Sequence, residues 1–395
     1  MSDEFTARQR AITLRLAGRS VQQVCHAVGR TKAWFHKWWR RYLAFGADGL
    51  FDLTRANCHV AARIPPELER TILSIRRRLE GHVGPGARYR LVGANVILAE
   101  LKALNVRPLP SLRTIDRVLQ RHGITAPRVR LAKLLPRQVY PAPQAERSNQ
   151  LHEIDLVGPI YLKGRRQRYY IWVCKDAFDG AVCLRLANSR LMDEVLAFLG
   201  ECWKSLGIPE QVQFDNAREI CGWGRGARYL SRVIRLCLRF GIGPWFIPPR
   251  QPQYNGSAEN FNGWFQPRLL QRRFGRPGRL RCELATLEET VNTQHVHPRL
   301  GGLTPFQHRR RQRLQKLPQR YLVPTDGVPI AAGRVTFIRM VSAKGTVKVL
   351  SQSFRVGKRH QGLYVKLVLD TQRGQLTTYL NGHVLKRWPY KLLNN

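Results

Sequence analysis

Two aspartates of this 395-residue chain lie in stretches where apolar side chains prevail. Asp155 stands in Leu-His-Glu-Ile-Asp-Leu-Val-Gly and Asp215 in Val-Gln-Phe-Asp-Asn, and both patterns are typical of buried strands. A charged side chain in a buried strand costs free energy unless it is paired or binds a cation. Carboxylate oxygens are hard anionic ligands of the kind that Mg²⁺ prefers. The two aspartates therefore indicate a shared metal site.

A third carboxylate, Glu259, lies where the chain changes from loop to helix. Prolines at positions 248, 249 and 252 exclude a regular helix or a central strand, whereas Asn255-Gly256-Ser257 favours a turn and a helix start. The 3.6-residue period of that helix separates an apolar face from a polar face. The polar face carries Glu259, Asn262, Gly263 and Gln266. Alone, Glu259 could be only a favourable partner of the helix dipole; with the two aspartates it is a candidate third metal ligand.

The motifs around these carboxylates carry a family resemblance. His-x-x-Asp at 152–155, Phe-Asp-Asn at 214–216 and Asn-Gly-x-x-Glu at 255–259 resemble the Asp, Asp, Glu (DDE) triad of the retroviral integrase and insertion-sequence transposase superfamily. The segment 297–306 is similar to the one that ends the catalytic core in many bacterial members. Together the motifs cover residues 148–310.

The resemblance implies a ribonuclease H-like core and a DNA transposase that cuts next to element ends and joins the freed 3′-hydroxyl to target DNA. Asp155, Asp215 and Glu259 would be the catalytic residues and would hold two Mg²⁺ or Mn²⁺ ions. Two such ions, about 3.5–4 Å apart, deprotonate the attacking oxygen and stabilise the leaving oxygen. Asn262 and Gln266 would face DNA. The chain departs from the retroviral pattern in its longer spacing from Asp215 to Glu259.

Other polar residues near these motifs have simpler interpretations. Glu153 shares a strand face with Asp155 by alternation, and Asp176 and Asp179 flank a turn, so turn or solvent roles explain these acids without a metal. Asn216 and His152 could orient the ligands or a phosphate. Pro267 is expected to kink the helix that carries Glu259, because it cannot donate a hydrogen bond to Gly263.

The charge of the chain identifies its partner as a polyanion. Its 67 Lys and Arg residues against 26 Asp and Glu give a formal net charge of +41. The basic residues are spread over the whole chain, and no apolar stretch of about 18 residues or signal peptide is visible, so double-stranded DNA is favoured over a membrane. We expect a cytoplasmic, nucleoid-associated bacterial protein. The eight cysteines stand singly, which argues against a disulfide scaffold and a structural zinc site.

Residues 1–55 are predicted to form a helix-turn-helix DNA-binding domain, with helices over 7–16 and 21–28 and a third that begins at Thr31. Phe35, Trp38 and Tyr42 recur at helical spacing and should form its core. Lys32, Trp34, His36, Lys37, Arg40 and Arg41 remain for DNA. The alternative is a plain three-helix bundle with a solvated basic face.

Residues 56–123 are predicted to form a second helical, helix-turn-helix-like DNA-binding domain, in which Arg113 and Arg117 face outward from a helix over 111–122. Alternatively, this domain only separates the first from the core. Residues 124–147 combine prolines and bases without periodicity, which is typical of a linker. This linker is predicted to run along DNA and to contact it through Arg128, Arg130 and Lys133.

The remaining pattern predicts a multidomain protein with an α/β core over 148–310 and a basic connector and small β-barrel over 311–395. In the core, three strands precede alternating helices and strands, which indicates a mixed α/β sheet. The barrel would bind DNA through exposed basic side chains, which include Arg339 and Lys366. Because inserting an element requires two cut ends, we expect a homo-oligomer on DNA. A DNA-binding regulator that has kept the fold without the chemistry is the alternative, and a ribonuclease H is a weaker third.

Overall fold

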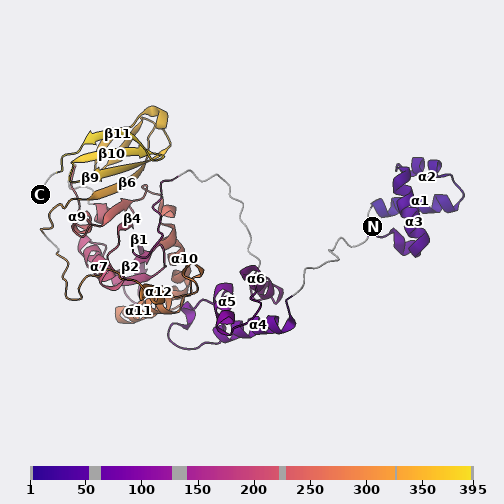
Figure 1. Ribbon diagram of the computed structural model, residues 1–395, viewed down its shortest axis with the longest axis horizontal. Helices are drawn as coiled ribbons and strands as arrows, with labels where there is room; N and C mark the ends of the chain where they lie inside the picture. Colours follow the sequence, from indigo (N-terminus) through magenta and orange to yellow (C-terminus); the bar gives the residue numbers. More distant parts are fainter. Residues whose placement is uncertain (1–2, 53–63, 127–139, 222–227, 325–326, 393–395) are drawn as a thin grey trace. The chain divides into compact units, whose positions relative to one another are not determined.

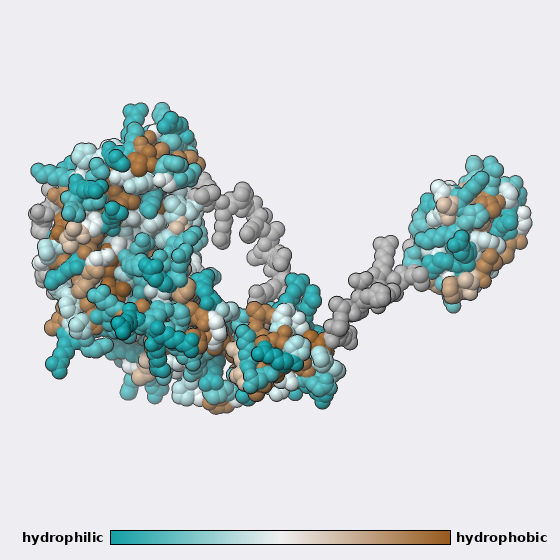
Figure 2. Space-filling model, viewed as in Figure 1, coloured by the Kyte–Doolittle hydropathy of each residue, from teal (hydrophilic) through white to brown (hydrophobic). Residues whose placement is uncertain are grey.

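The computed structural model describes residues 3–52, 64–126, 140–221, 228–324 and 327–392. The chain forms two compact units, Met1–Ile64 and Pro65–Asn395. Hydrophilic side chains prevail on the face shown in Figure 2, as the net charge of +41 requires. Within the described ranges, no helix has the length and apolar character needed to cross a membrane.

The N-terminal unit is a three-helix domain, as the sequence predicts. It consists of α1 (Asp3–Leu16), α2 (Val21–Val28), α3 (Lys32–Phe45) and the 3-10 turn η1 (Gly46–Leu50). Ser20 begins α2 by accepting a hydrogen bond from the backbone N–H of Gln23, and Gly29 ends it with a φ of 65°, which a residue without Cβ adopts at little cost. Phe35 and Trp38 are buried in its core, as predicted.

A second helical segment begins the larger unit. It comprises α4 (Pro66–Glu80), η2 (Ala87–Tyr89), α5 (Ala94–Ala103) and α6 (Leu112–Arg121). Ile115, Val118 and Leu119 face inward from α6, as predicted. Tyr89 attaches the segment to the core: its hydroxyl donates to Glu283 at 2.8 Å, and its carbonyl contacts His295 Nε2 at 2.6 Å.

The core is built on a nine-stranded sheet in the order β11-β10-β9-β6-β5-β4-β1-β2-β3 (Figure 1). Its first five strands are β1 (Leu151–Tyr161), β2 (Arg168–Asp176), β3 (Val182–Ala187), β4 (Gln211–Phe214) and β5 (Gly243–Phe246). β1, β2 and β3 form an antiparallel meander, whereas β4 and β5 run parallel to β1. This is the mixed sheet that the sequence predicts.

Helices cover both faces of this part of the sheet. The helices are α7 (Met192–Ser205), α8 (Arg218–Cys221), α9 (Arg232–Arg239), α10 (Gly256–Leu270), α11 (Pro277–Gln294) and α12 (Pro305–Arg309), with short turns η3 (Pro252–Tyr254) and η4 (Pro298–Leu300). Alternation along β2 sends Trp172 into the core with α7 and α9, and Val173 into the core with α10 and α11. α10 continues through Pro267 to Leu270.

The C-terminal strands extend the core sheet, and the predicted barrel is not confirmed. These elements are β6 (Arg334–Met340), β7 (Thr346–Val349), β8 (Gln352–Arg355), η5 (Lys358–His360), β9 (Tyr364–Asp370), β10 (Gln375–Leu380) and β11 (His383–Pro389). β6 pairs in parallel with β5, where Trp245 faces Thr336 and Phe246 faces Phe337. β7 and β8 form a separate two-stranded sheet. Because β5 offers an unpaired edge, β6 joins it, and the strands form an open extension.

Candidate active site

Asp155 lies on β1 at the side of the sheet that α10 covers. Its Oδ2 accepts a hydrogen bond of 2.6 Å from the Asn262 amide of α10, and its Oδ1 accepts the Leu156 backbone N–H at 2.9 Å. The pKa of Asp155 is raised to about 6, first by burial and then by the negative charges of Asp215 and Glu259, while these two hydrogen bonds lower it. The other two predicted carboxylates therefore both act electrostatically on Asp155.

Asp215 is brought to Asp155 by the parallel pairing of β1 and β4. Glu153 pairs with Gln213 in this ladder, and two further residues along each strand bring Asp155 level with Asp215. Both aspartates line one cleft of about 300 Å³, together with Arg168 and Arg190. Asp215 Oδ1 also accepts the Ala217 backbone N–H at 3.0 Å, which fixes the turn after β4.

Glu259 lies in the first turn of α10, and burial raises its pKa. The start of this helix is tied to the sheet at several points. Glu153 Oε2 accepts the Ala258 N–H at 2.7 Å, and the Asn255 amide donates to the Ile154 carbonyl at 3.0 Å. Lys175 donates to the Ser257 carbonyl at 3.1 Å.

Glu153 is therefore a helix anchor and not a turn or solvent acid. Burial raises its pKa to about 7. Strand alternation correctly predicts that Glu153 and Asp155 share a face, but it gives no sign that a helix N-terminus lies over Glu153. A free N–H at the first turn of a helix is an ordinary partner for a carboxylate, so the role could have been considered.

The residues around Asp155 fit a divalent cation that is only partly held by protein. Within the described residues, no three His, Cys, Asp or Glu side chains converge closely enough to hold a metal ion. Mg²⁺ usually takes one or two carboxylates and fills its shell with water and substrate phosphate oxygens. Asp155 and Asp215 can supply those carboxylates. Asn262 Oδ1 is buried without a hydrogen-bond partner beside Asp155, which leaves one more oxygen to be satisfied.

The residue after Asp215 connects the site to the C-terminal strands. The Asn216 amide donates to the Ile247 carbonyl, and its oxygen accepts a hydrogen bond of 2.8 Å from Arg339 of β6. Arg339 is only 5% exposed, and burial lowers its pKa to about 10. The prediction that Arg339 is exposed for DNA is thus wrong, because its position on β6 points it beneath the turn that carries Asp215.

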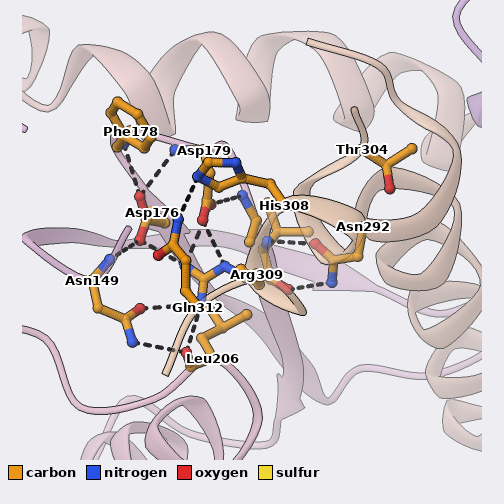
Figure 3. Close-up of polar contacts among 12 residues, drawn as sticks. Asn149, Asp176, Phe178, Asp179, Leu206, Asn292, Thr304, His308, Arg309 and Gln312 are labelled. Atoms are coloured by element: carbon orange, nitrogen blue, oxygen red, sulfur yellow. Dashed lines mark hydrogen bonds and ion pairs between the residues drawn. The ribbon is translucent and has the colours of Figure 1, made fainter. Parts of the chain in front are cut away.

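A second acidic cluster in the core has a structural role (Figure 3). Arg309 of α12 lies between Asp176 and Asp179, with ion pairs of 2.6 Å and 2.7 Å. Both aspartates are fully buried, so the expected solvent role is wrong. His152 belongs to the same region: it contacts Asn149 Oδ1 at 2.9 Å and Cys174 Sγ at 3.6 Å, and so it does not orient the carboxylates of the cleft.

The residues predicted to contact DNA from α3 differ in exposure. Lys32, His36, Lys37 and Arg40 are exposed. Trp34 is half-buried and packs against both apolar clusters of the domain. Arg41 is half-buried and donates to the Phe51 carbonyl at 2.7 Å. The exposed residues of α3 therefore form a basic surface, flanked by these two partly engaged side chains.

The other predicted DNA contacts are more scattered. Arg113 and Arg117 are exposed on α6, and Gln266 is half-buried on α10. Asn262 differs from the prediction, because it is 6% exposed and its amide faces Asp155 instead of solvent. Predicted contacts in the linker lie outside the described residues; they are Arg128, Arg130 and Lys133.

The chain thus combines an N-terminal helix-turn-helix domain with a mixed α/β core whose sheet carries two carboxylates in one cleft. Residues 3–51 match the model of a homeodomain-like domain family. A homeodomain-like domain is a helix-turn-helix variant in which the third helix reads the major groove of DNA. The third helix of the matched segment is α3.

Comparison with solved structures finds retroviral integrases. The catalytic core domain of HTLV-2 integrase, solved with magnesium, is 20% identical, with a TM-score of 0.33 over 42% of this chain and 98% of its own. A simian T-cell lymphotropic virus intasome is 17% identical, with a TM-score of 0.35 over 75% and 93%. The core domain of BIV integrase is 18% identical, with a TM-score of 0.30 over 40% and 93%. These likenesses are remote, so the function of this chain has to be argued from its own residues.

Proposed function

We propose that this protein is a DDE-type DNA transposase or integrase, which cuts DNA at element ends and joins the freed 3′-hydroxyl to target DNA. The observation that carries the proposal is the position of Asp155. It shares a cleft with Asp215, is hydrogen-bonded to the helix that carries Glu259, and has its pKa raised by both carboxylates. A buried carboxylate whose ionisation is disfavoured by two further acids is an arrangement that a divalent cation would stabilise.

The residues divide the chemistry between them. Asp155 and Asp215 would hold the ions, and Glu259 would complete the set from α10. When bound, two Mg²⁺ or Mn²⁺ ions would supply a deprotonated attacking oxygen and stabilise the leaving oxygen. Asn262 keeps the Asp155 carboxylate in one orientation. Arg168 and Arg190 line the same cleft and offer positive charge to the phosphate backbone.

DNA recognition is assigned to the helix-turn-helix domain. Lys32, His36, Lys37 and Arg40 would face the duplex from α3, and the overall charge of +41 would supply affinity that does not depend on sequence. The core provides one set of three carboxylates. Joining two element ends to one target needs two such sets, so the active form would be a homo-oligomer assembled on DNA.

The proposal is tested by replacing each acid with its amide. Asp155→Asn, Asp215→Asn and Glu259→Gln should each abolish Mg²⁺- or Mn²⁺-dependent cleavage and strand transfer and leave DNA binding intact, because each removes a carboxylate and no volume. The substrate is DNA from the two flanks of the gene, where the proposal expects inverted repeats. Glu289→Gln is the matched control, because Glu289 is exposed on α11.

The same assay separates the alternative. A wild-type chain that binds the repeats and cuts nothing in either metal would be a DNA-binding regulator. Cleavage that persists in a chelator would rule out the metal mechanism, and wild-type cleavage by any one amide variant would remove that acid from the site.

A further inference from the structure

The C-terminal strands carry a second feature, because one face of their sheet is apolar and the other is not. Alternate residues enter the core with α7 and α9; they are Val335, Phe337, Val365, Leu367, Leu369 and Leu376. The residues between them line a hollow of about 720 Å³. We call this hollow the sheet groove, and its main side chains are Arg334, Lys366, Arg373, Tyr379, Arg387 and Trp245.

The sheet groove is rich in positive charge. It contains four Lys or Arg residues and one acid, Asp370. Asp370 lies 3.8 Å from Arg334, and it is the one acid among the residues that line the groove with these four cations. Burial and the charge of Arg334 lower the pKa of Lys366. An anion in the groove would relieve this repulsion.

Aromatic rings lie among these cations. Lys366 Nζ is 4.9 Å from the centre of the Trp245 ring, and Tyr379 is half-buried on β10. Cations and aromatic rings side by side in one groove are typical of surfaces that bind single-stranded nucleic acid. On such surfaces the nucleobases stack on the rings, and the phosphates pair with Lys and Arg side chains. A duplex presents its phosphates on the outside and its bases inside, so it offers nothing to the rings.

The sheet groove lies on the same face of the sheet as the candidate active site. Gln211 of β4 lines the groove, and Gln213, the next residue on that face, donates to the Tyr254 carbonyl just before α10. Glu153 of β1 pairs with Gln213 in the ladder, and it accepts a hydrogen bond from the Ala258 N–H in the first turn of α10. The groove and the helix that carries Glu259 therefore follow one another along one rigid sheet surface.

We infer that the sheet groove binds an unpaired stretch of DNA strand next to the cleavage site. The inference rests on the proposed function for the source of that strand, since an unpaired strand arises where a duplex opens for cutting or joining. The groove residues would hold the strand by its phosphates and by stacking on Tyr379, and the carboxylate site would act on the adjoining duplex.

The test is binding of a fluorescent oligothymidylate to the full chain, compared with a duplex of the same length. Replacing Tyr379 and Arg387 together by Ala should weaken binding of the oligothymidylate about tenfold or more and change duplex binding by much less, because stacking is worth roughly 1–3 kcal/mol per base. Arg387 is exposed, so its loss removes no core volume. Arg387→Ala alone keeps the test valid if the double variant is unfolded by circular dichroism.

Two controls separate this site from general attraction to charge. Lys344→Ala with Arg355→Ala removes exposed charges outside the groove and should affect both oligonucleotides alike and weakly. A bromodeoxyuridine oligonucleotide should cross-link to peptides within 375–387. Equal losses for groove and control variants, equal losses for both oligonucleotides, or cross-links only elsewhere would overturn the inference. Metal-dependent cleavage is measured in a separate assay. The inference about the groove can therefore be refuted while the proposed function stands, and the proposed function can be refuted while the groove still binds the single strand.

Discussion

Two acidic clusters lie in the same core and differ in what neutralises them. Asp176 and Asp179 are fully buried, and Arg309 of the same chain forms an ion pair with each. Asp155 is partly buried, and within the described ranges it has an amide and a backbone N–H as partners, with Asp215 and Glu259 as like charges. Arg309 gives the first cluster a cation of its own, His152 Nε2 lies 3.6 Å from Asp176, and the cluster stabilises the fold. For the second cluster we propose a cation from outside the chain, and this is how a metal site would differ from a structural ion pair.

The largest expected effect comes from removing the arginine of the first cluster. Arg309→Met should lower the free energy of unfolding by about 3–5 kcal/mol, because two buried carboxylates lose the guanidinium that pairs with both. Chemical denaturation of the variant measures the effect. Arg310→Met is the matched control, because Arg310 is exposed one residue further along. A loss of less than about 1 kcal/mol would mean that water or another group neutralises Asp176, and the comparison would fail.

A change of the opposite sign is expected at the cluster around Asp155. The pKa of Asp155 is raised to about 6 in the folded chain, so ionisation of this group costs stability as pH rises from about 4 through 6. Asp155→Asn removes that cost. In a metal-free buffer at pH 7.5 the variant should be more stable than the wild type by about 1–3 kcal/mol, and the gain should vanish near pH 4.

Metal should reverse this order of stability. Because a ligand that binds only the folded state stabilises it, Mg²⁺ should raise the melting temperature of the wild type and not that of Asp155→Asn. Thermal unfolding at several pH values, with and without Mg²⁺, measures both effects. A variant that is less stable than the wild type at every pH would show that the carboxylate is structural, like Asp176.

The sequence predicts the second cluster better than the first. Asp155 and Asp215 were identifiable because each interrupts an apolar strand, and strand positions follow from local alternation. The role of Arg309 could not be identified from the sequence, because its partners lie more than 100 residues away in the chain and no local pattern marks a buried arginine. The barrel is not confirmed for a similar reason: the positions of β6 to β11 follow from alternation, but the pairing of β6 with β5 depends on which edge is free in space.

The smallest expected effect tests whether burial alone makes the difference. Arg147 and Glu210 form a surface ion pair whose N–O distance, 2.6 Å, equals that between Arg309 and Asp176, but their side chains are 62% and 51% exposed. An exposed pair gains little because water screens it and because both side chains lose freedom. A double-mutant cycle with Arg147→Met and Glu210→Gln should give a coupling of about 0.2–1 kcal/mol that weakens further in 1 M salt. A coupling as large as that of the Arg309 cluster would show that distance, and not burial, sets the strength of these pairs, and the contrast between the two buried clusters would then need another cause.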